Sequence, residues 1–177
     1  MQLKSTSTQY GRMAISLHWL SALGAILAFA AGFSVVNLAP PERQAPILVV
    51  HIVLGLIVFA LTLLRLLWWL AFDRHPGAPA GQPRWQALSA QIVHVGLYVL
   101  LILMATSGIA TVLLSGALPT LLAGGPVPDL SELVPRIAHG VMSKLLLLLF
   151  VVHVGAAIYH QVIRGDRLLA RMGLGRA

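Results

Sequence analysis

Residues 137–163 read IAHGVMSKLLLLLFVVHVGAAIYHQVI, and this stretch decides the fold class. It is apolar over most of its length, with Lys144 as its one Lys and no Asp, Glu or Arg. A helix needs about 20 apolar residues to cross the hydrocarbon core of a bilayer. The stretch is long enough for one crossing, so we expect a transmembrane helix here.

Three further stretches of similar length and character precede it, at residues 13–38, 47–72 and 88–114. Prolines and charged residues separate the first three stretches, and a Gly- and Pro-rich loop at 115–135 separates the last two. Loops are short and no second apolar or polar domain is visible. We therefore expect an all-α fold, a bundle of four transmembrane helices that forms one domain over residues 1–177.

The first stretch also has features of a secretory signal peptide, because Lys4 and Arg12 precede its apolar run. The apolar part of a signal peptide is typically only about 7–15 residues long. The run here is longer and begins with His18 and Trp19, so we expect a retained helix.

The composition excludes several classes of protein. Hydrophobic residues make up 58% of the 177 residues and charged residues 10%, against about 25% charged residues in a soluble domain. The net charge is +7, but the basic residues flank apolar segments and do not cluster, so no nucleic-acid partner is expected. The absence of cysteine excludes disulfides, thiolate metal sites, iron–sulfur clusters and covalently attached haem. Any metal chemistry must therefore use histidine or carboxylate side chains, and the seven histidines are the residues to explain.

The distribution of Lys and Arg predicts the orientation. Cytoplasmic loops of membrane proteins carry an excess of these residues. One side of the predicted bundle holds nine of them: Lys4, Arg12, Arg65, Arg74, Arg84, Arg164, Arg167, Arg171 and Arg176. The other side holds three: Arg43, Arg136 and Lys144. Both termini are therefore expected in the cytoplasm, and the net charge is mainly a topology signal with some attraction to anionic lipid.

Histidines inside a membrane are costly and usually functional. In the last stretch His139, His153 and His160 share one helix face, at about 100° per residue. His139 and His153 are separated by about 21 Å along the axis, which indicates two sites at different depths. His18 lies at the depth of His153 and His51 at the depth of His139. We therefore expect the pairs His18 with His153 and His51 with His139.

Paired histidines on facing helices can hold haem iron from both axial sides, and without cysteine such a haem is of the b type. Gly55, Gly140 and Gly155 lie near the paired histidines and would leave room for a flat macrocycle, although glycine is also common where membrane helices pack closely. A single membrane histidine can instead be an interhelical hydrogen-bond partner. Four histidines matched in depth favour two haem or metal sites.

The other three histidines have less defined roles. His75 adjoins Pro76 in a loop and is expected to be solvated. His94 and His160 lie near the cytoplasmic side, where proton transfer or quinone binding competes with interfacial packing as an explanation.

A set of short motifs resembles the prokaryotic cytochrome b(561) family of four-helix dihaem membrane cytochromes. The resemblance extends from about Tyr10 to Met172. Its motifs, in order, are Tyr10-x-Arg12, Ile15-Ser16-x-His18-Trp19, His51-x-x-x-Gly55, Arg65-Leu66, His94-x-x-x-Tyr98, Gly108, the histidines 139, 153 and 160, and Leu168-Leu169-x-Arg171-Met172. Each motif is weak alone, but their order and spacing together are specific.

The resemblance implies that the first, second and fourth helices carry the haem ligands, which gives the same two pairs. It implies a hydrogen-bonding or quinone-side role for His94 and a quinone-site role for His160. It further implies electron transfer to ubiquinone in the bacterial inner membrane by a multi-pass protein. Some members resemble superoxide oxidase, in which superoxide donates the electron from the periplasm; a protein partner is possible but not required.

Several cations have two explanations each. Arg43, Arg136 and Lys144 lie on the periplasmic side and could steer superoxide, or they could pair with Glu42 and Glu132 or anchor helix ends. Asp129 is the third acidic residue of that side.

Arg12 and Arg65 lie near the cytoplasmic side, and Arg65 follows His51 by fourteen residues on nearly the same helix face. Each arginine could bind a haem propionate, or its side chain could snorkel to the lipid headgroups.

Two other functions remain open at this stage. One is the cytochrome b subunit of a larger membrane dehydrogenase or hydrogenase, in which a docked partner delivers the electrons. The other is a haem-free transporter that uses histidine to carry metal ions or protons. A transporter of that kind would be colourless, whereas a dihaem cytochrome is red.

Overall fold

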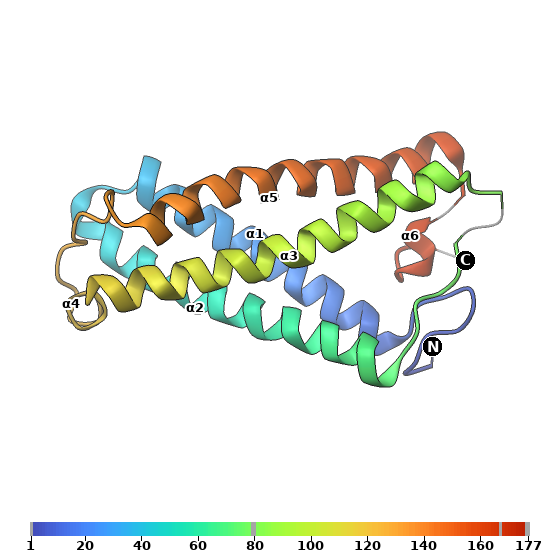
Figure 1. The fold of residues 1–177 in the computed structure, drawn as a ribbon, viewed down its shortest axis with the longest axis horizontal. Coiled ribbons are helices and arrows are strands. Elements are labelled where there is room, and N and C mark those ends of the chain that lie inside the picture. Colours follow the sequence, from blue (N-terminus) through green and yellow to red (C-terminus); the bar gives the residue numbers. More distant parts are fainter. Residues whose placement is uncertain (1, 79–80, 167, 176–177) are drawn as a thin grey trace.

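Four long helices run the length of the molecule, as the sequence predicts (Figure 1). They are α1 (Arg12–Asn37), α2 (Pro41–Leu67) with its π-helical continuation η1 (Trp68–Phe72), α3 (Arg84–Ser115), and α5 (Val134–Ile158) with its π-helical continuation η2 (Tyr159–Arg164). Two short helices, α4 (Leu118–Leu122) and α6 (Leu168–Arg171), lie near the bundle ends. The computed structural model describes residues 2–78, 81–166 and 168–175; Arg167 and Arg176, counted above for orientation, lie outside these ranges.

A proline lies at or next to the first residue of three long helices, and the observed starts correct the predicted boundaries. The second helix begins at Pro41 and not at residue 47, and α3 begins at Arg84 after Pro83. The last helix begins at Val134, with Pro135 in its first turn. Proline has no N–H, but the first turn of a helix has no intrahelical acceptor for one, so proline is tolerated there. The helix end at Ser115 has a different cause, because Gly116 adopts a left-handed φ of 61°.

The bundle buries small residues and exposes large apolar ones. The buried residues of α1 are Ala14, Ser21, Gly24 and Ala28. Large apolar side chains on all four long helices are exposed, among them Leu20, Leu23, Val53, Leu103 and Leu148. This distribution is the reverse of that in a soluble protein and is typical of helices that pack through small residues and face lipid. All four long helices are long and apolar enough to cross a membrane.

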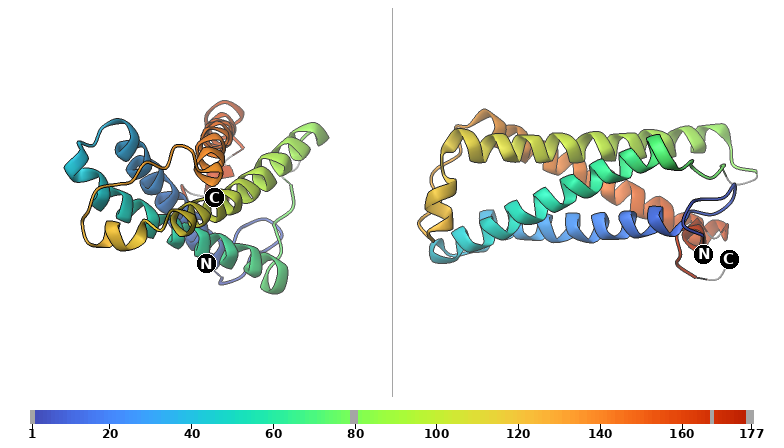
Figure 2. Two further views of the ribbon diagram at one scale, coloured as in Figure 1. Left: turned by 60° about the vertical axis from the view of Figure 1, so that its left-hand side comes forward. Right: turned by 90° about the horizontal axis from the view of Figure 1, so that it is seen from below.

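The long helices form two closely packed pairs. Helix α1 packs along α2, and α3 packs along α5, while α2 also contacts α3. Figure 2 shows the bundle from two further directions. Within the described residues, the backbone of α5 makes little close contact with α1 or α2. Side chains therefore span the interface between α5 and the α1–α2 pair.

Both chain termini lie at one end of the bundle, here called the terminal end, and α4 lies at the other, the α4 end (Figure 1). At the terminal end Arg171 donates from Nε to the Thr8 carbonyl (2.7 Å) and from Nη2 to the Gly77 carbonyl (2.8 Å). Asp73 accepts hydrogen bonds from the Ser5 backbone and hydroxyl and from Trp68. The segment before α1, the α2–α3 loop and α6 are thus joined. An even number of crossings places the two termini on one side, as predicted; that this side is the cytoplasm stays a prediction.

Candidate functional site

The structure places the four paired histidines in two close pairs. At the α4 end the ring centroids of His51 on α2 and His139 on α5 lie 5.9 Å apart, with ring planes at 80°. At the terminal end the centroids of His18 on α1 and His153 on α5 lie 6.2 Å apart, with planes at 61°. Both pairs cross the interface between α5 and the α1–α2 pair. The bundle therefore contains two histidine layers, the α4-end layer and the terminal-end layer.

Each long helix contributes one residue to each layer at a spacing of fourteen residues. The contributing pairs are His18 and Gly32 on α1, Arg65 and His51 on α2, His94 and Gly108 on α3, and His153 and His139 on α5. Fourteen residues correspond to about 21 Å along a helix and return the chain to nearly the same face. Gly32 was not predicted as a member of this set, although the repeated spacing of fourteen residues was a signal for it.

Two glycines make room for the imidazoles of the α4-end layer. A Cβ atom on Gly32 would lie 2.8 Å from Cε1 and 2.9 Å from Nδ1 of His51. A Cβ atom on Gly108 would lie 3.3 Å from Cε1 of His139. The predicted glycines contribute differently, because Gly55 and Gly155 face no atom within 4 Å, and a Cβ atom on Gly140 would instead meet Arg136 at 3.2 Å.

Backbone carbonyls orient both imidazoles of the α4-end layer. Nδ1 of His51 lies 2.7 Å from the Ala28 carbonyl oxygen, and Nδ1 of His139 lies 3.0 Å from that of Met104. The Ser107 hydroxyl is also 3.1 Å from Nδ1 of His139. A carbonyl oxygen only accepts, so Nδ1 carries the hydrogen in both rings and Nε2 keeps its lone pair for a metal. Metal-binding histidines are commonly oriented in this way.

The terminal-end layer contains a cation in place of such carbonyls. Nη2 of Arg65 lies 3.1 Å from Nδ1 of His18, and Nη1 donates to the Ser21 hydroxyl at 3.2 Å. The guanidinium carbon also lies 5.0 Å from the ring centre of Tyr98. The ring of His94 lies 5.2 Å from that of His153. His94 was predicted near the cytoplasmic side but not in this layer, and Tyr98 was predicted only as part of a motif.

The other predicted cations lie nearer the surface. Arg12, the first residue of α1, is exposed, so Arg65 is the arginine within the layer. Arg43 and Lys144 are exposed, and Arg136 is partly exposed in the first turn of α5, about one turn before His139. Among the described residues no ion pair joins these three cations to an acidic side chain.

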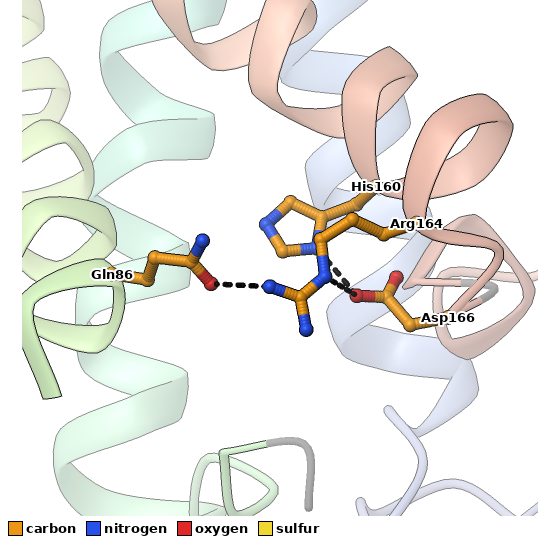
Figure 3. Close-up of polar contacts among 4 residues, drawn as sticks. All are labelled: Gln86, His160, Arg164 and Asp166. Carbon is orange, nitrogen blue, oxygen red and sulfur yellow. Dashed lines mark hydrogen bonds and ion pairs between the residues drawn. The ribbon is translucent and has the colours of Figure 1, made fainter. Parts of the chain in front are cut away.

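A polar cluster at the terminal end surrounds His160, which is buried on η2 (Figure 3). Its Nδ1 lies 2.5 Å from a carboxylate oxygen of Asp166, and Nε of Arg164 lies 3.9 Å from the same oxygen. Arg164 also donates from Nη1 to the side-chain carbonyl of Gln86 on α3 at 3.3 Å. His94 is not part of this cluster. His75 is exposed as predicted, although its ring stacks on Trp69 at 3.8 Å.

The ring separations in both layers suit a metal held between two imidazoles. Metal–nitrogen bonds of about 2 Å on each side place the two ring centres roughly 6 Å apart. The described residues contain no cluster of three or more His, Cys, Asp or Glu able to hold a metal ion by themselves. A haem needs only two axial ligands from the protein, because its macrocycle supplies the other four nitrogens. The residues present therefore fit a haem better than a bare ion.

The fold and the site define a class of protein, a four-helix membrane bundle with paired histidines between its helices. Residues 9–175 match the family model described as prokaryotic cytochrome b561, and the chain belongs to this family. A curated relative is Cytochrome b561 homolog 1 of Escherichia coli (strain K12). It is 26% identical over 172 residues, which cover 93% of this chain and 96% of the relative. The protein is thus a haem b-binding membrane cytochrome in electron transfer.

Gly32→Ala tests whether the close approach of α1 to His51 is needed for haem binding. The added methyl group would displace the ring and weaken its hydrogen bond to Ala28. We expect haem affinity at the α4-end layer to fall by roughly 10- to 100-fold, the range for residues that orient metal ligands. Haem content per chain, measured as the pyridine haemochrome, checks this.

Gly24→Ala is the matched control on the same helix. Its Cβ atom would lie 2.9 Å from a methyl carbon of Val58 and would strain the α1–α2 contact without touching a histidine. Full haem content in Gly32→Ala, or equal haem loss in both variants, would contradict the assignment of Gly32 to this layer.

Proposed function

We propose that the protein holds two b-type haems, one between His51 and His139 and one between His18 and His153, and transfers electrons from superoxide to ubiquinone. The observation that carries the proposal is the pair of ring separations, 5.9 Å and 6.2 Å, in two layers at different depths of one bundle. We place the α4 end in the periplasm and the terminal end in the cytoplasm of a bacterial inner membrane, because Lys and Arg are concentrated at the terminal end.

The residues of the chain bind and orient the redox groups, and each haem, when bound, supplies a one-electron carrier. The carbonyls of Ala28 and Met104 keep Nε2 of His51 and His139 available as ligand atoms. At the other layer, ligation through Nε2 of His18 requires the hydrogen on Nδ1. Arg65, which only donates, must then turn to another acceptor. A haem propionate is such an acceptor; Arg12, the other arginine predicted for this role, is exposed at the first residue of α1.

The electron balance sets the stoichiometry. Two superoxide anions each lose one electron at the periplasmic side and leave as dioxygen. One ubiquinone gains these two electrons and two protons and leaves as ubiquinol. Arg43, Arg136 and Lys144 all lie toward the α4 end, and their positive charge would raise the local concentration of the superoxide anion.

The polar cluster around His160 is the proposed quinone site. Its hydrogen bond to Asp166 takes up Nδ1 and leaves Nε2 of the buried ring for a quinone oxygen. The second carboxylate oxygen of Asp166 is buried without a hydrogen-bond partner. His94 lies against His153, so its proposed role is beside the haem and not in direct contact with quinone.

Loss of single ligands tests the two pairs. In His51→Ala and in His18→Ala we expect one haem to be lost and the other retained, because each variant removes one axial bond from one layer. Haem content and the α-band of the reduced protein measure this. Retention of both haems in either variant would contradict the pairing.

Stopped-flow mixing of the oxidised protein with superoxide tests the donor. We expect fast haem reduction, followed by reoxidation that depends on added ubiquinone. Reduction that is slow or absent would favour a cytochrome b subunit that receives electrons from a partner dehydrogenase or hydrogenase. A haem-free transporter is excluded by family membership.

His160→Ala tests the quinone site. We expect weaker quinone affinity, seen as a higher quinone concentration for half-maximal reoxidation, with both haems retained because the cluster shares no residue with either pair. His75→Ala is the control, since His75 is an exposed histidine at the same end of the bundle. Unchanged affinity in His160→Ala would remove the basis for this site.

A further inference from the structure

The Arg65 guanidinium carries a positive charge within the terminal-end layer that no carboxylate neutralises among the described residues. Its neighbours are the Ser21 hydroxyl, the imidazole of His18 and the ring face of Tyr98. These groups hold a guanidinium in place through hydrogen bonds and a cation–π contact but leave its charge intact. Arginine remains protonated in proteins, so the charge is permanent.

We propose that Arg65 makes the two layers electrically unequal, so that the haem between His18 and His153 has the higher reduction potential. Electrons then move spontaneously from the α4-end layer to the terminal-end layer. This inference rests on the proposed ligand pairs and supplies a driving force for electron transfer between them. Arg65 acts here as a positioning and charge-setting residue and not as a ligand.

The sign follows from the charge of the iron. Ferric haem carries one more positive charge than ferrous haem, so a nearby cation disfavours the ferric form and raises the potential. The low dielectric between membrane helices strengthens this effect. If Arg65 turns to a propionate, it offsets that negative charge, and the potential is again higher than without the arginine.

The contacts of the α4-end layer act in the opposite direction and lower the reduction potential of a haem held there. Both of its imidazoles donate Nδ1–H to backbone carbonyls, at 2.7 Å from Ala28 and 3.0 Å from Met104. Such hydrogen bonds make imidazole a more basic ligand and favour the ferric form. Among the described side chains, His18 and His153 make no corresponding hydrogen bond to a backbone carbonyl. The charge of Arg65 and the carbonyl hydrogen bonds of the other layer therefore both give the terminal-end layer the higher potential.

Arg136 is the cation that could oppose this difference, because it lies about one turn before His139. It is partly exposed in the first turn of α5, where water and salt screen its charge. Arg65 instead lies more than one turn inside the span that ends at Phe72. Arg65 therefore has the larger effect of the two arginines.

Redox titration of the single-haem variants tests the order of the potentials. His51→Ala retains the haem between His18 and His153, and His18→Ala retains the other. We expect the haem in His51→Ala to titrate at the higher potential. Equal or reversed potentials in two variants that each hold one haem would overturn the inference and leave the proposed ligand pairs intact. Variants that hold no haem, or two, would instead contradict the pairs themselves.

Arg65→Gln in the otherwise unchanged protein tests the cause. We expect the equilibrium constant for electron transfer between the haems to fall at least tenfold, which corresponds to a drop of at least 59 mV in the higher potential. Arg65→Lys keeps the charge and should shift this potential less. Arg136→Gln is the matched control and should leave the higher potential unchanged. If the higher of the two potentials is unaltered in Arg65→Gln, the role of Arg65 is overturned. If Arg65→Gln loses a haem, the order of the potentials in the two single-haem variants decides the inference.

Discussion

Two imidazole pairs span an interface that the backbone does not close, and most features of the bundle follow from this. Helix α2 contacts α3, but α5 makes little close contact with α1 or α2, so His18 with His153 and His51 with His139 bridge α5 to the α1–α2 pair. A bilayer requires every spanning backbone group to be satisfied within its own helix. The side chains that meet between the helices must therefore be spaced by nearly whole numbers of helical turns. The spacing of fourteen residues on all four helices satisfies this requirement and creates two layers at once.

The sequence was sufficient for the features that depend on helical periodicity. Four apolar stretches predicted the four long helices, and residue counts along them predicted which histidines meet. The predicted helix starts were wrong by several residues. At Pro41 proline was interpreted as a separator although the first helical turn tolerates it, and at Arg84 the predicted apolar stretch left out the polar residues of the first turn. The short helix α4 was not predicted within the Gly- and Pro-rich loop, where five residues of helix give little periodic signal.

Contacts between helices were harder to predict than positions along them. Periodicity gave the face and depth of Arg65, but not that its guanidinium would reach Nδ1 of His18 on the neighbouring helix. Nor does a sequence show which of many glycines faces an imidazole: Gly32 does, whereas Gly55, which was predicted from its closeness to His51, faces no atom within 4 Å. These details depend on helix rotation and crossing, which a single sequence does not specify.

The joined segments at the terminal end have a consequence for how the chain is assembled in the cell. Arg171 bonds to the carbonyl of Thr8, and the Trp19 indole donates to the carbonyl of Met172 at 3.0 Å. Arg171 and Met172 are translated only after all four long helices have been made. Thr8 must therefore wait for a residue 163 positions later in the chain before it reaches its final partner, so this contact forms only after all four long helices have been translated.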